Sequence, residues 1–560
     1  MSTVSTVSAV STVSAVPTMS TVRVAVVGGG HQGLVAAVVL ARAGLDVTVL
    51  EAGPEPGGCL WTGDVGGLAV ERGAVDHGGL RGVADELGLD RFGLRYVERD
   101  RLCSAVFGDG EVRDFEVSVD RTAERLGPDA DAYRALAEQA GAFFAVLDRF
   151  PVPPTPTALA GTLAHLRGGD ETFRSLLSSA EAVVERRVDD PHLRAALALY
   201  AAHGQIPPWA PGSGMLAFLL PGSHGSPAVR PEGGGRAVVA ALVTALGAAG
   251  GQVRTGAVVR SVARGAGGLV VELDDGERLA VDRVVSTLDV RRTTALLADP
   301  PAAMTRSAVG VASGRLNVSE LTVALTLPEG ALPERLRDPH GPITFVQDGL
   351  GDLRRGFGDL VAGRLPGTPW AMVARADVRP ADDDGWATGV AGEAGGTRRA
   401  ALWLSSVVPL HRDDGAWTPR RERAAADRVL ATASRVLGVD LAGAAGDVVV
   451  SGPAVWATRL RSDGNPNHLD LTLDQMLGWR PPGLPGHRTP VPGLYLAGSG
   501  THPGGGLSGT SGRSAATALL TDLGTRSRRA GPGPVGRVGR EVVGLWRAFG
   551  AYLAMRREGR

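Results

Sequence analysis

The strongest constraint on the fold is a strand–helix–strand pattern near the amino end of the chain. Val22–Val27 is a β-branched run that predicts a fully buried parallel strand. An apolar helix to about Ala43 follows, and Gly44 stands where such a helix would end. A second run, Asp46–Leu50, then leads to Glu51. Together these segments predict a βαβ unit of about 30 residues, which needs a parallel sheet covered by helices.

The turn between the first strand and the helix has the spacing of a dinucleotide-binding site. Its glycines allow a tight turn, a close approach of the backbone to a pyrophosphate, and helix–strand contact. These glycines are Gly28, Gly30 and Gly33. His31 and Gln32 lie between them, at the start of a helix whose free N–H groups favour phosphates. Glu51 would bind ribose hydroxyls and disfavour a 2′-phosphate, so we expect an adenosine-diphosphate cofactor such as FAD or NAD.

Composition removes several other classes of protein. The chain has 560 residues, enough for two or three domains, and none of them is lysine. Schiff-base enzymes and phosphate loops that end in Gly-Lys are therefore excluded. Cys59 and Cys103 are too far apart in sequence for a redox-active pair or a zinc site, so we expect free thiols and no metal. The formal net charge of −1 attracts no polyanion, so we expect no nucleic-acid partner.

Changes of pattern divide the chain into interleaved segments. Apolar residues have helical spacing from about 120 to 200, and strands return between 253 and 285. A further buried strand, Leu494–Ala497, enters a second glycine-rich turn. We expect an α/β protein with a discontinuous Rossmann-like cofactor-binding domain and a mixed, partly helical substrate domain. The expected cofactor-binding segments are 22–110, 229–300 and 486–525, and the expected substrate-domain segments are 111–228, which is helical, and 301–485.

The two ends of the chain differ from the segments between them. Residues 1–21 repeat uncharged Ser, Thr and Val units and predict a disordered tail. Residues 526–560 hold nine Arg against two Glu, and apolar residues recur at helical spacing over 537–557. Such a helix could lie on an anionic membrane surface or dock on its own domain. Neither a secretory signal nor an apolar run of about 20 residues is evident, so we expect a cytoplasmic protein, and the membrane alternative for 537–557 would place it at the inner face of the membrane.

Three parts of the chain resemble one known family. Residues 28–34 look like the His-Asn-Gly-Leu form of the dinucleotide motif, with Gln32 where that form has Asn. Residues 51–58 resemble the extended signature of two-domain flavoproteins, and several segments between 472 and 506 resemble a carboxyl-terminal flavin signature. The chain is similar to phytoene-dehydrogenase-related FAD oxidoreductases, a group that includes carotenoid desaturases and retinol saturases. The resemblance extends from about residue 24 to residue 520.

This resemblance implies a non-covalent FAD and further cofactor contacts. Gly57 and Gly58 match the point where the chain turns back across the cofactor, and Val259 matches a valine whose backbone meets the adenine. The second glycine-rich turn and the residues after it would meet the flavin ring through Gly498, Ser499, Gly506, Leu507 and Ser508. A separate NAD(P)H fingerprint is missing, so oxygen or a quinone would accept the electrons, or they would stay on FAD in an isomerisation.

The implied activity is removal of hydride from carbon of an apolar substrate, such as a polyene or another secondary metabolite, by a desaturase or dehydrogenase. His502 in the flavin turn and His77 after the βαβ unit are the candidate catalytic residues, each with a structural role as the alternative. Two other functions stay open. A flavin amine oxidase shares the fold but usually has a lysine near the flavin, and an FAD-containing protein could act through partners or a membrane without turnover.

Overall fold

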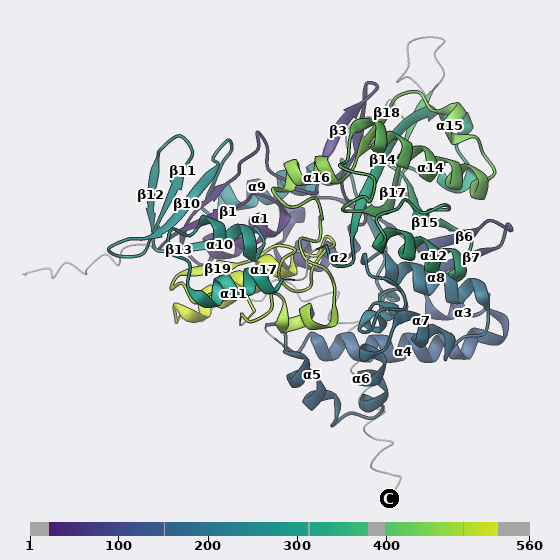
Figure 1. Ribbon diagram of the computed structural model, residues 1–560, viewed down its shortest axis with the longest axis horizontal. Coiled ribbons are helices and arrows are strands. Elements are labelled where there is room, and N and C mark those ends of the chain that lie inside the picture. The colour runs from purple at the N-terminus through teal and green to yellow at the C-terminus, as the bar shows by residue number, and fades with distance from the viewer. Residues whose placement is uncertain (1–21, 151, 312–313, 379–397, 485, 525–560) are drawn as a thin grey trace, which may run out of the picture.

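Two packed units form the computed structural model, one at the left of Figure 1 and one at the right. The structure describes residues 22–524 except 151, 312–313, 379–397 and 485. The tail expected at 1–21 and the helix expected over 537–557 lie outside the described residues. The five-stranded sheet of the first unit and the seven-stranded sheet of the second unit are separate.

A parallel five-stranded sheet is the centre of the first unit. Its strands, in spatial order, are β19 (Leu494–Leu496), β13 (Arg283–Ser286), β1 (Arg23–Val27), β2 (Asp46–Leu50) and β9 (Gln252–Arg254). Every neighbouring pair in this order is parallel. Segments separated by hundreds of residues therefore form one sheet, as expected for a discontinuous α/β fold.

Helices that are poor in large side chains cover this sheet. They are α1 (His31–Arg42), α9 (Gly234–Ala248) and α17 (Thr510–Asp522), and α1 packs against both of the others. Small residues such as Ala36, Ala37 and Ala515 are completely buried between them. The backbones of α1 and α17 can therefore approach closely, because small side chains leave little between them.

Smaller elements complete the first unit. The antiparallel sheet β10–β11–β12 contains the turn at Asp275–Gly276. The bounds of these elements are β10 (Val259–Arg264), β11 (Leu269–Leu273), β12 (Arg278–Val281), α2 (Gly78–Glu86), α10 (Val290–Leu296) and α11 (Ala302–Gly310).

The second unit is built on a mostly antiparallel seven-stranded sheet. Its strands, in spatial order, are β18 (Val448–Ser451), β14 (Val318–Pro328), β17 (Arg399–Pro409), β16 (Ala371–Arg375), β15 (Ile343–Gln347), β6 (Arg101–Phe107) and β7 (Val112–Glu116). Both faces are covered: Trp403 of β17 packs in one apolar cluster, and its neighbours Leu402 and Leu404 pack in another. This alternation is what a strand of period two between two apolar layers requires.

Helices form the two covering layers of this sheet. On one face, α14 (Pro419–Leu437) packs on β15 and β14 and against α15 (Leu441–Ala444), and α16 (Pro453–Leu460) contacts β14 and β18. On the other face is the predicted helical segment, below the sheet in Figure 1. It comprises α3 (Val119–Ala123), α4 (Ala130–Leu147), α5 (Pro156–Leu163), α6 (Gly169–Leu177), α7 (Ala180–Glu185) and α8 (Pro191–Ala202), followed along the chain by α12 (Leu350–Val361).

Two short antiparallel pairs of strands lie outside the main sheets. β3 (Thr62–Val65) pairs with β4 (Leu68–Glu71), and β5 (Tyr96–Arg99) pairs with β8 (Ala228–Pro231). The second pair brings residues more than a hundred positions apart into direct register, with Val97 opposite Arg230.

The boundaries expected at residues 110 and 300 fall between neighbouring elements of one unit, in the turn between β6 and β7 and between α10 and α11. β6 pairs with β15 in the seven-stranded sheet, so residues 101–107 lie in the second unit rather than in the cofactor-binding segment 22–110. Conversely, Met304 of α11 is buried with residues of the first unit. The local pattern gives no information on either point, because both are decided by contacts with residues far away in sequence.

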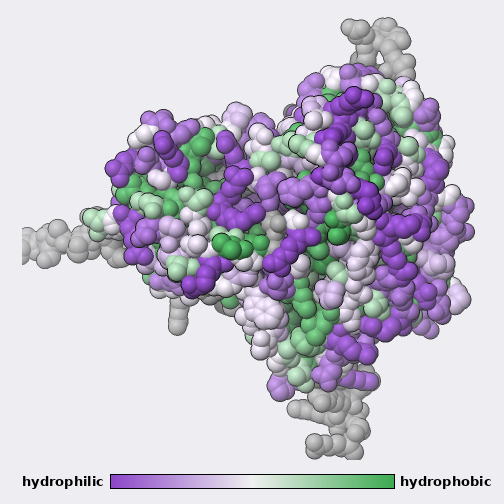
Figure 2. All heavy atoms as spheres, viewed as in Figure 1, coloured by the Kyte–Doolittle hydropathy of each residue, from purple (hydrophilic) through white to green (hydrophobic). Residues whose placement is uncertain are grey.

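The surface is mainly hydrophilic on the face shown in Figure 2, with hydrophobic patches that include one over the β10–β12 sheet at the left. Among the described helices, none is both long enough and apolar enough to cross a membrane.

Candidate active site

The first glycine turn, residues 28–33, connects β1 to α1. Gly28 has a φ of +97°, and its N–H donates to Leu50 O at 2.8 Å, so the turn is tied to the end of β2. A Cβ on Gly33 would lie 2.1 Å from Gly28 O. Gly30 is the N-cap of α1 and provides no side-chain cap, which leaves the N–H groups of the first helical turn available to an anion.

Glu51 is fixed beside this turn by backbone donors. Its Oε2 accepts from Gly29 N–H and its Oε1 accepts from Gly53 N–H, both at 2.7 Å. Since each carboxylate oxygen has a second lone pair, Glu51 can also accept hydroxyl groups of a ribose. This is the position that the sequence predicts for it, at the end of β2.

The paired glycines lie directly against the first glycine turn. Gly57 forms an isolated parallel bridge with Gly30, and Gly57 N–H donates to Gly29 O at 2.9 Å. A Cβ on Gly58 would lie 3.1 Å from the Cα of Gly30. The structure therefore brings these two glycine-rich segments together, although they are separated by more than twenty residues.

Val259 lies on the other side of Glu51, at the start of β10. The neighbouring Ala257 N–H donates to Glu51 O at 2.8 Å, and Gly256 N–H donates to Gly53 O at 2.9 Å. Val259 itself is half-buried. Its backbone is consequently close to the end of the turn where a ribose and its base would lie.

The second glycine turn, residues 498–506, connects β19 to α17 through Leu507 and Ser508. Gln32 Oε1 accepts from Gly512 N–H at 2.8 Å, which joins the start of α1 to the first turn of α17. A Cβ on Gly79 would lie 3.0 Å from Leu507 O, so the segment that starts with His77 also touches this turn. Most of the site residues predicted from the sequence thus meet around the two glycine turns.

Arg480 supports the second glycine turn, a role that the sequence does not identify. Its buried guanidinium donates to four backbone carbonyls at 2.7 to 3.0 Å, those of Asn467, Leu469, Asp470 and Ser499. Burial lowers the pKa of Arg480 to about 9, with Asp470 acting in the opposite direction. The guanidinium therefore connects Ser499 to the loop 467–470 by hydrogen bonds to backbone carbonyls rather than by a single ion pair.

The histidines at the site are neutral; His31 and His77 are buried, and His502 is half-buried. The pKa of His77 is lowered to about 3 by burial and by the positive charge of Arg230, and that of His31 to about 4 by burial. The pKa of His502 is also lowered to about 3, by burial and by the neighbouring His487 and Arg480. Different groups surround His77 and His502. Near neutral pH neither imidazole is protonated, so neither can donate a proton as an imidazolium.

Two charged residues near the site were missed because isolated charges in apolar segments give no motif. Arg459 of α16 donates through Nε to Gly58 O at 2.8 Å, and its guanidinium lies over the ring of Trp61. Glu71 is buried and accepts from Gly235 N–H at 2.6 Å and from Thr62 Oγ1 at 3.1 Å. Burial raises the pKa of Glu71 to about 7, with these donors opposing the shift.

A cavity lies between β8, β16 and the segment around His77. One lobe, of about 380 Å³, is polar and is lined by Glu71, His77, Arg230 and Arg375 among others. It adjoins a narrow lobe of about 40 Å³ that shares Val75, Arg230 and His340 with it. The narrow lobe has a mainly apolar lining, including Leu102, Tyr200, Ile343, Phe345 and Met372. We call the two lobes together the Arg230 cavity.

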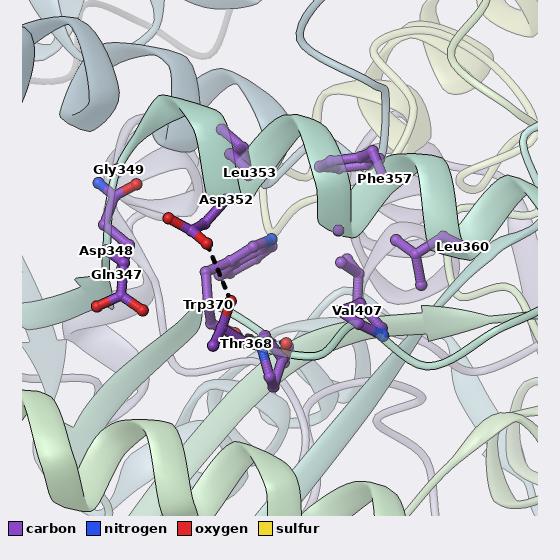
Figure 3. A pocket seen from close by; sticks show the side chains of 14 residues that line it. Gln347, Asp348, Gly349, Asp352, Leu353, Phe357, Leu360, Thr368, Trp370 and Val407 are labelled. Carbon is purple, nitrogen blue, oxygen red and sulfur yellow. Dashed lines mark hydrogen bonds between the residues drawn. The ribbon is translucent and has the colours of Figure 1, made fainter. Parts of the chain in front are cut away.

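A separate hollow beneath α12 is too small for a substrate. It measures about 10 Å³ and lies between α12 and the strand residue Val407, with Thr368 Oγ1 donating to Asp352 Oδ1 at 3.2 Å (Figure 3). That volume holds about one water molecule. It is therefore not a binding site for a larger molecule.

The residues at the glycine turns fit a dinucleotide. The start of α1 suits the pyrophosphate, the Glu51 carboxylate suits the ribose, and the second glycine turn leads to the start of α17. His31 Nε2 and Gln32 Nε2 are buried and have no hydrogen-bond partner among the described residues. Buried polar atoms of this kind are normally satisfied, so their position next to the turn indicates that a bound group completes the site.

Comparison with known proteins agrees with this geometry. The family model described as flavin-containing amine oxidoreductase matches residues 33–520. Hydroxyneurosporene desaturase of Cereibacter sphaeroides is 27% identical over 545 residues, covering 90% of this chain and 99% of that protein. A subunit of limonene dehydrogenase from Castellaniella defragrans is 23% identical over 555 residues, covering 90% of this chain and 95% of that protein.

Solved structures share the fold. A variant of putrescine oxidase superposes with a TM-score of 0.57 at 20% identity, covering 90% of this chain and all of that protein. Taken with the family match, this similarity agrees with a two-domain flavoprotein fold and with FAD as the cofactor.

Proposed function

Since the chain belongs to the family of flavin-containing amine oxidoreductases, it is an FAD-dependent oxidoreductase, and we propose that it is a desaturase or dehydrogenase that removes hydride from carbon of an apolar substrate. Two curated relatives that span most of the chain are named as a hydroxyneurosporene desaturase and as a subunit of limonene dehydrogenase. These names support a hydrocarbon-like substrate for this protein.

Residues of both glycine turns hold the cofactor in this proposal. The pyrophosphate is bound at Gly30 and the start of α1, the ribose at Glu51, the adenine at the backbone of Val259, and the ring at Gly498, Ser499, Gly506, Leu507 and Ser508. His31, Gln32, Gly57 and Gly58 shape the same cradle. When bound, FAD supplies an acceptor for a hydride from carbon.

The apolar lining of the Arg230 cavity is the observation that carries the proposal. Tyr200 and Phe345 lie 5.5 Å apart between ring centroids, and Ile343 and Met372 line the same lobe. At about 40 Å³ this lobe admits a short apolar group of a substrate, from which such a lining excludes water. The seven-stranded sheet thus provides the substrate-facing wall.

Neutral imidazoles suit this reaction better than charged ones. His77 lines the cavity, and its low pKa keeps a positive charge away from a carbon that becomes electron-poor as hydride leaves. We assign His77 a place next to the substrate. His502 lies by Arg480 and His487, so we assign it a role in fixing the second glycine turn.

A flavin amine oxidase is the second candidate, favoured by the match to the family of that name and by the fold shared with putrescine oxidase. One feature opposes it: the chain contains no lysine, the residue that this group of enzymes usually has near the flavin.

Oxygen or a quinone is the proposed electron acceptor. Contact of 537–557 with the inner face of the cytoplasmic membrane stays a proposal, and it would place the enzyme where apolar substrates and quinones dissolve.

The variant Gly30→Ala tests whether the cofactor takes part in turnover. A Cβ at Gly30 meets no protein atom closer than 3.8 Å, so the fold should accept it while the approach of a pyrophosphate is blocked. FAD content per chain and substrate oxidation should be lost together, with the free energy of unfolding of the cofactor-free protein unchanged. Activity that survives the loss of FAD would contradict the proposal and favour a protein in which the cofactor is structural.

A further inference from the structure

One arginine in the substrate cavity has an unused hydrogen-bonding edge. Arg230 lies on β8, and its Nη1 donates to Arg375 O at 2.9 Å. Its Nη2 is buried and has no hydrogen-bond partner among the described residues. No carboxylate of the described part of the chain lies within ion-pair distance of its guanidinium. A buried cation without a partner is costly, so such a group usually has a function or a ligand.

The other arginines of the cavity are already paired. Arg99 donates to Asp338 at 3.0 Å. Arg375 is paired with Asp377 at 2.8 Å and with Glu329 at 2.9 Å. Arg230 is therefore the cation of this lining that remains available to a ligand.

The acidic groups that face Arg230 do not replace such a ligand. Asp338 and Asp377 are each bound to another arginine. Glu71 accepts from Gly235 and Thr62, and burial raises its pKa to about 7, so a large share of it is protonated near neutral pH. Asp76 accepts from Gly78 N–H at 3.1 Å. Each has a donor of its own within hydrogen-bond distance, and none pairs with Arg230.

Arg230 stands where the polar and the apolar lobes meet, and it lines both. The polar lobe also contains His77, whose neighbour Gly79 touches Leu507 beside the second glycine turn. The apolar lobe leads in another direction, among Leu102, Phe345 and Met372. A ligand with an anionic group at Arg230 therefore has the lobe of about 380 Å³ for its chain, and the lobe of about 40 Å³ admits only a short apolar group.

We propose that the substrate carries a carboxylate, and that Arg230 binds this carboxylate through its guanidinium while the chain lies in the lobe of about 380 Å³ and only a short apolar group enters the narrow lobe. This inference rests on the proposed function and narrows its substrate class from apolar molecules to long-chain carboxylic acids. One free guanidinium edge matches one carboxylate. A diphosphate would need further free cations, which the lining does not provide.

The first test compares ligands on the unaltered, FAD-loaded protein. Equilibrium dialysis measures the dissociation constants of decanoate, methyl decanoate, 1-decanol and decylamine, which share a chain and differ in the head group. Decanoate should bind about 10- to 100-fold more tightly than the ester or the alcohol, as expected for a hydrogen-bonded charge. Decylamine should bind most weakly. Equal binding of decanoate and its ester, or tighter binding of decylamine, would overturn the inference.

The second test removes the charge. In Arg230→Gln the advantage of decanoate over methyl decanoate should disappear, whereas Arg230→Lys should restore part of it. Arg134→Gln is the matched control, because Arg134 is paired with Asp120 and Asp131 on the surface helix α4 and is remote from the cavity lining. If Arg230→Gln keeps the full preference for decanoate, Arg230 is not the carboxylate ligand.

The flavin content and reducibility of the same samples separate this inference from the proposed function. Protein that contains reducible FAD but shows no preference for the carboxylate contradicts the Arg230 assignment alone. Protein that binds decanoate selectively but whose flavin is reduced by no hydrocarbon or fatty-acid donor contradicts the proposed function and leaves the carboxylate site standing.

Discussion

The cofactor side and the substrate side of the site are built by different means. Around the two glycine turns, the binding surface consists of backbone N–H groups and of positions where a Cβ would collide with a neighbour, as at Gly33. The Arg230 cavity is formed instead by side chains from β4, β8 and β16, several of them charged and buried. A closely packed backbone position such as Gly33 tolerates no added atom, whereas a cavity of side chains responds mainly to a change in charge.

The largest effect should come from Arg480, which supports the second glycine turn on the cofactor side. Arg480→Leu leaves four buried or half-buried carbonyls without their donor. At about 1 kcal/mol or more for each, the free energy of unfolding should fall by about 4 kcal/mol. Urea denaturation measures this change, and Arg134→Leu on the surface should cost less than about 1 kcal/mol. A small loss for Arg480→Leu would mean that the second glycine turn is held by other contacts.

The pH dependence of the free energy of unfolding should distinguish the charged residues of the cavity from the backbone of the glycine turns. The pKa of Glu71 is raised from its ordinary 4.5 to about 7, so the folded protein holds a proton that the unfolded chain has lost between these values. The contribution of Glu71 to the free energy of unfolding is fully present below about pH 4.5 and decreases as the pH rises to about 7. The total decrease is about 3 kcal/mol.

The matched variant for this measurement is Glu71→Gln, which cannot ionise. The difference in free energy of unfolding between the wild type and this variant should change by about 3 kcal/mol from pH 4.5 to pH 7, with the wild type losing stability. A constant difference over this range would show that Glu71 ionises normally in the folded protein.

A smaller effect should separate two glycines of the same turn. In Gly33→Ala the new Cβ would lie 2.1 Å from Gly28 O, and overpacking of this kind costs about 1–3 kcal/mol. In Gly30→Ala the nearest protein atom is 3.8 Å away, so the stability of the cofactor-free protein should stay within about 0.5 kcal/mol. Calorimetry on both variants without FAD makes the comparison. Equal losses would mean that Gly30 is required by the fold rather than by the cofactor.

The contrast between the two sides also explains what could be predicted from the sequence. Some features depend only on neighbours in the chain, namely the first glycine turn, Glu51 and the alternation of buried strands. Periodicity and spacing are therefore sufficient to identify them. The role of Arg230 depends on the register of β8 with β5 and on Arg375, which is 145 positions away. Arg480 likewise acts on Ser499 through a folded loop. A single charged residue gives no local signal of such contacts.

The two candidate histidines illustrate the same limit. His77 and His502 were selected because each lies in or next to a glycine-rich segment. Their neutral state follows from burial and from Arg230 and Arg480, which are distant in sequence. The residue type could be identified from the sequence, but its protonation state could not.

The most direct test of the central claim is the visible absorption spectrum of the purified protein during anaerobic addition of lipophilic donors, followed by oxygen. The account predicts the bands of oxidised flavin, bleaching by a long-chain unsaturated acid or polyene but not by an amine, and recovery in air or with a quinone. A colourless protein that cannot be reconstituted with FAD, or a flavin that only amines reduce, would contradict it.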